Sequence, residues 1–300
     1  MADNFNGRSD VKLPEAVSSE IIQKTQEGSA IMRLARQIAL PGTGMSVNII
    51  TSDPEAEWVA EGAKKPVKKG TFASKKITPY KLAVIVPFSM EFTRDAAALY
   101  NALVARIPMA MGEKFDNTVF GGTTKPGEDF DQLNKVKAQE LSTDPISALV
   151  NADLDISEHD GVTNGYAISP KAKAVLLTAK DTTGRPLFVD SIAQNGVPTI
   201  LGAPTYISKG CKTADAVAYA GDWTKAVYGV TSALSITLSD QATLALSDGT
   251  TLNLWQQNMV AIRAEMEIGF RADTTVFNRF TYTDKTSGGG PEGKDDLRDS

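Results

Sequence analysis

The sequence has little of what catalysis usually needs. It contains one histidine, His159, and one cysteine, Cys211. A Ser–His–Asp arrangement would have to use His159, and no glycine-framed serine is present to act as the nucleophile. A phosphate-cradling glycine loop is also missing, because Gly42-Thr-Gly44 lacks the third glycine. These absences argue against an enzyme, and we expect no catalytic residues and no cofactor.

Other absences limit the cellular context. A lone cysteine excludes an internal disulfide and suits a reducing compartment. No apolar run approaches the roughly 20 residues that span a bilayer, and the N-terminus lacks the basic and apolar regions of a signal peptide. The net charge is −5 and the sequence pI is about 5.1, so no overall basic field favours nucleic acid.

The surroundings of the single histidine do not build a metal site. The run from Asp153 to Gly161 is typical of a helix end that leads into a turn, so we expect a surface histidine. Asp153, Asp155 and Ser157 resemble the start of a calcium loop. That loop needs Gly at its sixth position and Glu at its twelfth, where this chain has Glu158 and Asn164. We therefore predict no metal site.

Residues 48–80 are charged, extended and poor in apolar side chains, with acids in the first half and lysines in the second. An isolated two-stranded hairpin is marginally stable in water, so contacts from outside the subunit are expected to support this segment. We predict that it forms a subunit interface through Glu55, Glu57, Trp58, Val59, Glu61, Lys64, Lys65, Lys68, Lys69, Phe72, Lys75 and Lys76.

A strand and a long helix follow the charged segment. Apolar and other residues alternate over Leu82–Phe88. Pro87 cannot donate to a ladder, so the strand either ends there or lies at a sheet edge. From Ser89 to Phe120 apolar residues recur three or four apart, which predicts a helix of about 45 Å. Pro108 should kink it.

The middle of the chain, Asp144 to about Gly249, alternates short helices and strands with polar turns, which indicates a mixed α/β unit. One helix is expected to begin at Asp144-Pro145, and a second to run from Ser169-Pro170 to Leu177. The predicted strands are Tyr166–Ile168, Val197–Leu201, Thr205–Ser208, Val217–Ala220, Ala226–Val230 and Leu234–Leu238.

The ends of the chain complete the pattern. Even-numbered residues are apolar over Val260–Phe270, which predicts a strand of roughly 36 Å. A second strand, Thr275–Tyr282, is expected to return beside it. Near the N-terminus, Leu13–Gly28 and Ser29–Ile38 read as short helices. After Thr286 the composition is that of a flexible polar tail.

The order of these parts resembles the major capsid protein family of tailed bacteriophages, with its Hong Kong 97-type fold. The resemblance spans roughly Leu13 to Tyr282 and is carried by short motifs in the family's order. They include Ala56-Glu-Trp58-Val-Ala-Glu61-Gly62, Lys81–Glu91, Glu113-Lys-Phe-Asp116, Ile168-Ser-Pro170, Leu201-Gly202-Ala-Pro204 and Gly221-Asp222-Trp223.

The resemblance implies an α+β fold with five parts. These are an N-terminal arm (1–47), an extended β-hairpin loop (48–80), a peripheral domain with the spine helix and long strands (81–143 and 252–284), a mixed α/β axial domain (144–251), and a tail (285–300).

The function that the resemblance implies is a coat protein. It would self-assemble as pentamers and hexamers into an icosahedral head shell around double-stranded phage DNA, without sequence readout or membrane contact. It would reside in the virion, be assembled in the host cytoplasm, and work with a separate scaffolding protein, a portal and a decoration protein. Some relatives crosslink a loop lysine to a neighbour's asparagine. Here the lysines from Lys64 to Lys76 would be donors, and Asn278 or Asn253 the acceptor.

Three other functions remain open at this point. An encapsulin shell has the same fold and encloses a protein cargo instead of DNA. A hydrolase or transferase would use the middle unit as its catalytic domain, which the shortage of histidines disfavours. A phage tail-tube or adaptor protein would form rings or tubes, which the long helix disfavours.

Overall fold

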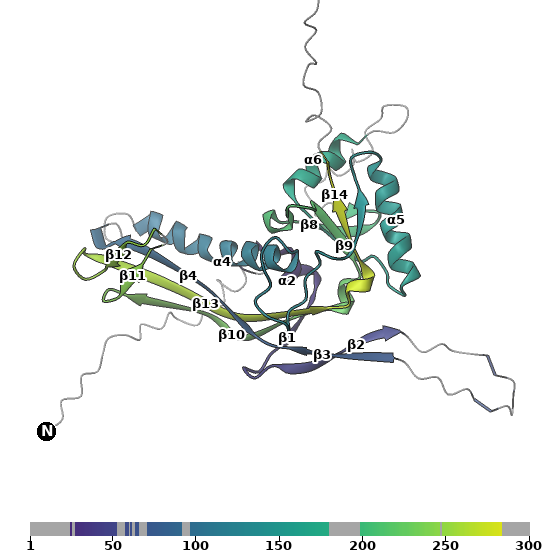
Figure 1. Cartoon of the computed structure of the whole chain (residues 1–300), viewed down its shortest axis with the longest axis horizontal. Coiled ribbons are helices and arrows are strands. Elements are labelled where there is room, and N and C mark those ends of the chain that lie inside the picture. The colour runs from purple at the N-terminus through teal and green to yellow at the C-terminus, as the bar shows by residue number, and fades with distance from the viewer. Residues whose placement is uncertain are drawn as a thin grey trace, which may run out of the picture.

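The computed structural model describes residues 25, 28–52, 58–59, 61, 64–65, 71–91, 97–179, 199–246 and 248–283. They form an elongated sheet with one long helix lying along it, and a compact mixed sheet at one end of this plate (Figure 1). One large apolar core runs through both parts. The chain is therefore an α+β protein whose two sheets are packed as one body.

The elongated sheet has four strands in the order β1-β10-β13-β4. Their bounds are Arg36–Ala39 (β1), Ala226–Ser239 (β10), Met259–Ala272 (β13) and Tyr80–Ser89 (β4). The alternation predicted over Val260–Phe270 is confirmed, since Ile262, Ala264 and Ile268 are all buried. The strand β4 lies at the sheet edge, as Pro87 predicted, and its buried end is Phe88.

The long helix α4 (Ala97–Val119) lies along this sheet (Figure 1). Its buried residues Ile107, Met111, Phe115 and Val119 recur at helical spacing, as predicted. The ring of Phe115 meets that of Phe270 edge-on, with centroids 6.4 Å apart, so the long helix and the long strand do pack together. Pro108 lies inside α4, and the kink expected there stays a prediction.

The predicted start of this helix is wrong. Strand β4 continues to Ser89, where Met259 pairs with it, and only then do Met90 and Glu91 adopt helical backbone. Pairing with β13 therefore holds in the sheet the residue that periodicity alone assigned to the helix.

The compact sheet has six strands in the order β5-β14-β9-β6-β8-β7. Helices α5 (Pro145–Glu158) and α6 (Pro170–Thr178) flank it and begin at the predicted caps, Asp144 and Ser169. Trp223 and Phe277 pack edge-on within its core. The strand bounds are Lys137–Glu140 (β5), Gly165–Ile168 (β6), Thr199–Ile200 (β7), Ala203–Ile207 (β8), Ala218–Gly221 (β9) and Phe277–Thr281 (β14).

Long-range pairing overturns three further predictions. The helix predicted over Ser29–Ile38 ends early, as α2 (Ala30–Leu34), because the next residues form β1 beside β10. The return strand β14 pairs with β5 and β9, and not with β13. The two strands predicted within residues 226–238 are one strand, β10, which absorbs the interruption in bulges between Val230 and Ser235.

The strand pairing also bears on the five parts drawn from sequence, which remain a proposal. Strand β10 falls within 144–251 yet pairs with β13 of the elongated sheet. Strands β5 and β14 fall within the other ranges yet belong to the compact sheet. The polar tail and most of the N-terminal arm lie outside the described residues.

Candidate subunit interface

A two-stranded hairpin separate from both larger sheets contains much of the predicted interface. Its strands are β2 (Met45–Ser52) and β3 (Thr71–Ile77), paired antiparallel from Met45–Ile77 at the base to Ser52–Thr71 at the far end. Figure 1 shows the hairpin beneath the compact sheet, directed away from α4. Its composition explains the separation, because a segment with few apolar residues has little surface to bury on the body.

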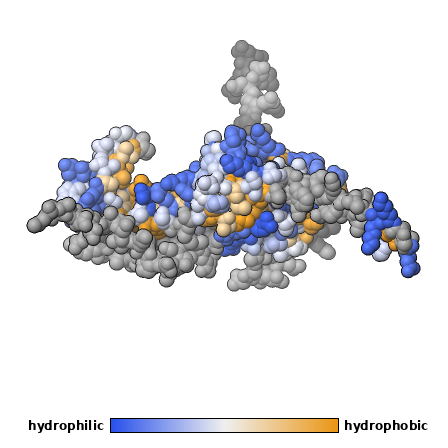
Figure 2. All heavy atoms as spheres, turned by 90° about the horizontal axis from the view of Figure 1, so that it is seen from below, coloured by the Kyte–Doolittle hydropathy of each residue, from blue (hydrophilic) through white to orange (hydrophobic). Residues whose placement is uncertain are grey.

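The described residues beyond the paired strands are all solvent-exposed. Trp58 has a relative exposure of 105% and Val59 of 39%, and Glu61, Lys64 and Lys65 are exposed as well. In a view from below, hydrophilic atoms predominate at this end of the molecule (Figure 2). Phe72 lies on β3, opposite Ile50. Glu55, Glu57, Lys68 and Lys69 lie outside the described residues.

The base of the hairpin is held by a clamp of charged residues, Arg271, Asp129 and Asp131. The Arg271 guanidinium, whose side chain is 10% exposed, donates to Asp131 Oδ1 at 2.8 Å and to Asp129 Oδ1 at 2.9 Å. Its Nε donates to the Lys76 carbonyl oxygen at 2.6 Å. Charge-assisted bonds of this geometry are the strong class, so the clamp ties β3 to β13 and to the loop that follows α4.

The same clamp gives Lys75 and Lys76 partners within their own subunit. Lys75 Nζ donates to Asp131 Oδ2 at 3.1 Å and to the Ala272 carbonyl oxygen at 2.7 Å. Lys76 Nζ lies 3.9 Å from Asp129 Oδ2. These contacts belong to the hairpin base, and the prediction that the two lysines also face a neighbour stays a prediction.

Apolar contacts and close backbone approach reinforce the base. Ile77 is fully buried in a small cluster with Leu40, Val47 and Val227. A Cβ added at Gly269 would meet the Thr78 carbonyl oxygen at 2.6 Å, so only glycine lets β13 approach the chain so closely here. The hairpin thus leaves the body from a fixed root.

Sequence reasoning missed the clamp. Its arginine and its two aspartates are 140 and 142 residues apart, and no local pattern joins them. The available signal was weak: an arginine near the end of β13, and two acids on either side of Phe130, which is 3% exposed.

A second joint attaches the N-terminal arm to the helix α4. Asp116 on α4 is fully buried, and its carboxylate accepts bonds from Ser29 Oγ at 2.5 Å and from the Ala30 amide at 2.8 Å. Burial raises the pKa of this carboxyl to about 6, against the opposing effect of hydrogen bonds from Ser208, Ser29, Ala30 and Ile31. Asp116 therefore takes up a proton at a higher pH in the folded subunit than in the unfolded chain.

Acid should stabilise the wild-type subunit relative to an Asp116→Asn variant. A folded-state pKa raised from 3.8 to about 6 gives stability that is complete below pH 4 and is lost as the pH rises through 6. Two units correspond to about 3 kcal/mol. We expect the difference in unfolding free energy between the two proteins to change by about 2 kcal/mol between pH 4.5 and pH 7, which urea unfolding of unassembled subunits measures. A difference that is equal at both pH values would contradict the assignment.

The structure narrows the crosslinking prediction. Asn278 is fully buried, and its Nδ2 donates to Asp155 Oδ2 at 2.8 Å. A neighbour's lysine cannot reach it, so Asn278 is wrong as an acceptor. Asn253 lies at the end of β12 (Thr251–Asn253), which pairs with β11 (Thr243–Ala245).

The residues considered for chemistry lie apart. His159 caps the end of α5 and is exposed, as predicted, with Nδ1 2.7 Å from the Asp155 carbonyl oxygen. Cys211 is buried, and burial raises the pKa of its thiol. Within the described part of the chain, no three His, Cys, Asp or Glu side chains are placed to hold a metal ion. Among the same residues, no helix is long and apolar enough to cross a membrane.

Comparisons with known proteins agree over most of the chain. The sequence model of the phage capsid family matches residues 10–274. The probable major capsid protein gp17 of Mycobacterium phage L5 is 31% identical over 292 residues, which cover 90% of this chain and 89% of the relative. The major capsid protein of Staphylococcus phage 80alpha is 25% identical over 293 residues, covering 93% and 87%.

Solved structures show the same fold. A chain of Mycobacterium phage Bobi superposes with a TM-score of 0.68 at 19% identity, covering 95% of this chain and 96% of that one. A chain of Gordonia phage Cozz gives 0.68 at 20% identity, covering 86% and 87%.

Proposed function

The chain belongs to the phage capsid family, and we propose that it builds its shell through the clamped hairpin. It is a major capsid protein, a structural component of the virion with the Hong Kong 97-type fold. What we add concerns how the subunits meet and what they enclose. In this proposal copies of the chain form pentamers and hexamers that close into an icosahedral head.

The observation that carries the proposal is a rigid root with an exposed end. Arg271 and the two aspartates fix the base of the hairpin, whereas Trp58 has a relative exposure of 105%. Leaving a tryptophan in water forgoes one of the larger apolar burials that a side chain can offer. A neighbouring copy would supply that burial.

The residues we propose for this interface are those predicted from sequence, without the two lysines of the clamp. Exposed ion pairs contribute only about 0–1 kcal/mol each, so the charges of the hairpin would set register while its apolar residues supply affinity. The proposed set is Glu55, Glu57, Trp58, Val59, Glu61, Lys64, Lys65, Lys68, Lys69 and Phe72.

The enclosed molecule in this proposal is double-stranded DNA. A subunit of net charge −5 would hold it loosely and without sequence readout, because phosphate contacts supply most non-specific affinity. A scaffolding protein, a portal and a decoration protein would be separate chains, and assembly would take place in the host cytoplasm. We propose no catalytic role, since His159 caps the end of α5 and Cys211 is buried.

Particles made in an expressing cell test this function. Lysates should contain fast-sedimenting material that electron microscopy shows as closed shells, and shells filled during infection should contain DNA. Rings or tubes would contradict the proposal, as would a specific protein cargo in place of DNA.

A further inference from the structure

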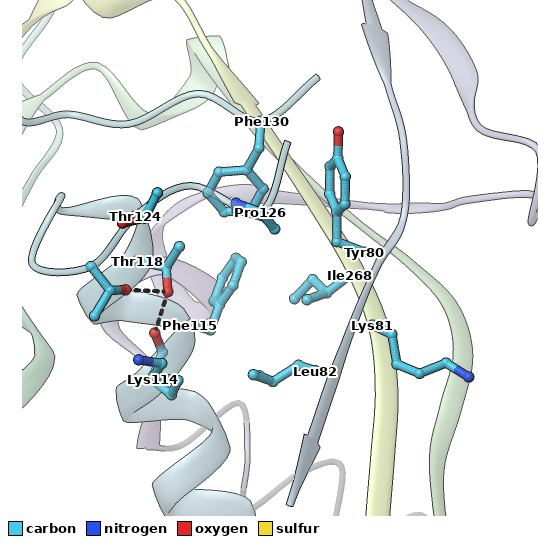
Figure 3. A pocket seen from close by; sticks show the side chains of 11 residues that line it. Tyr80, Lys81, Leu82, Lys114, Phe115, Thr118, Thr124, Pro126, Phe130 and Ile268 are labelled. Carbon is cyan, nitrogen blue, oxygen red and sulfur yellow. Dashed lines mark hydrogen bonds between the residues drawn. The ribbon is translucent and has the colours of Figure 1, made fainter. Parts of the chain in front are cut away.

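A cavity lies between the edge strand β4 and the C-terminal half of α4. Its volume is about 380 Å³, within the range of about 300–1,000 Å³ that is usual for ligand pockets. Figure 3 shows Leu82, Phe115 and Ile268 around it, with Thr124 and Pro126 on its other side. Phe115 and Ile268 belong to the core, so the floor of the cavity is apolar and preformed.

The mouth of the cavity carries positive charge. This charge comes from Lys114, which is exposed and lines the cavity. Lys125 stands between the lining residues Thr124 and Pro126, but its Nζ is paired with Glu128 Oε2 at 2.9 Å. Lys81 also lines the cavity, although its ammonium points away from it (Figure 3). An occupant with an apolar side chain and acidic neighbours would match both the floor and the mouth.

One segment of this chain has that chemistry. Trp58 follows Glu55 and Glu57 in sequence and precedes Glu61, and Val59 is exposed beside it. The whole indole of Trp58 is exposed at the surface of the subunit. An apolar cavity of a size that suits an indole opens on the same subunit.

The two do not meet within one copy in this structure. Residues 53–70 join the far ends of β2 and β3, and β3 spans seven residues before Thr78-Pro79-Tyr80 enters the cavity wall. Seven extended residues are about 23 Å long, and the clamp fixes the root from which they extend. The 105% exposure of Trp58 shows that its own subunit does not receive it.

We propose that Trp58 of one subunit inserts into the cavity between β4 and α4 of a second copy. Val59 then lies at the mouth beside Thr124, and the acids around Trp58 face Lys114. This inference rests on the proposed function and names the surface that the hairpin meets.

A disulfide between copies tests the placement while keeping Trp58 in place. The double variant Val59→Cys, Thr124→Cys should assemble and, after oxidation of the shells with diamide, run as covalent dimers and larger ladders on a non-reducing gel. The matched control pairs Val59→Cys with Lys173→Cys, exposed on α6, and should stay monomeric. The native Cys211 is fully buried and should not react.

The outcomes separate the two proposals. Shells whose Val59→Cys, Thr124→Cys subunits stay monomeric would overturn the insertion and leave the shell function standing. Absence of shells from the wild-type chain expressed together with its scaffolding protein would overturn the shell function itself.

Fluorescence tests the insertion if the cysteine variant fails to assemble. In a Trp255→Phe protein, Trp58 is the exposed tryptophan that remains, because Trp223 is 1% exposed. Acrylamide quenching of Trp58 should fall severalfold when subunits assemble. Equal quenching in free subunits and shells would overturn the proposal.

Discussion

Replacing Arg271 with glutamine should lower the free energy of unfolding of the subunit by about 2–4 kcal/mol. The change leaves the carboxylates of Asp129 and Asp131 facing each other without the guanidinium that bridges them. Breaking a fully buried pair costs about 3–5 kcal/mol. The expected loss is somewhat smaller because the Asp129 side chain is 33% exposed and Lys75 still pairs with Asp131. Urea unfolding of unassembled subunits measures it.

The same strand offers a matched control. Arg263 on β13 is 50% exposed, and its Nε lies 3.6 Å from Glu265. Arg263→Gln should therefore change stability by about 0.5 kcal/mol or less, as exposed substitutions usually do. If the two variants unfolded at the same urea concentration, the clamp would not be the root that we describe.

Loss of the clamp should also affect assembly under conditions where the variant still folds. Arg271 Nε holds the Lys76 carbonyl oxygen, so without it the direction of the hairpin is less constrained. Shell formation by Arg271→Gln at a temperature well below its unfolding should be slower and less complete than for Arg263→Gln. Light scattering at matched subunit concentrations measures the rate and the extent.

The elements that the sequence predicted well are those whose signal is local. The alternation that ends at Phe270 and the helical spacing through Phe115 each report a single buried face, so the long strand and the long helix were predictable. The caps Asp144 and Ser169 were predictable for the same reason, since each accepts hydrogen bonds from amides two or three residues ahead.

The elements that the sequence missed depend on distant partners. Arg36–Ala39 has helical spacing but becomes a strand because Val227–Val230 lies beside it. The strand β14 was recognised, yet nothing local states that its neighbours are β5 and β9 instead of β13. Which strands pair depends on the whole fold. A single sequence therefore predicts a strand more readily than it predicts the strand that pairs with it.

The candidate interface likewise contains residues whose environment local sequence predicted and residues whose environment depends on distant partners. Exposure of Trp58, Lys64 and Lys65 followed from a shortage of local apolar residues, and the structure agrees. The roles of Lys75 and Lys76 depended on Asp131 and Asp129, more than 50 residues further along the chain. The lysine-rich run therefore contains two groups of residues, those at the root of the hairpin and those at its exposed end. Only the burial of each lysine and its distance from an acidic partner distinguish the two groups.

Reversing the charge of the exposed lysines should block shell assembly and spare the fold. The variant changes Lys64, Lys65, Lys68 and Lys69 to Glu. The first two are exposed in the structure, and exposed substitutions usually change stability by about 0.5 kcal/mol or less. Like charges placed across an interface cost several kcal/mol, and a closed shell repeats that contact at every subunit. Sedimentation and circular dichroism should show folded subunits without shells.

A charge-conserving variant makes the test specific. Replacing the same four lysines with arginine keeps the positive charge and should preserve assembly, whereas glutamine should weaken it to an intermediate degree. Because exposed charges are screened by salt, with a Debye length of about 10 Å at 0.1 M, higher ionic strength should recover part of the assembly of the glutamate variant. Normal shells from the glutamate variant would mean that these lysines face solvent in the assembled head. An unfolded glutamate subunit would instead place them, like Lys75, among the contacts that hold the hairpin to its own body.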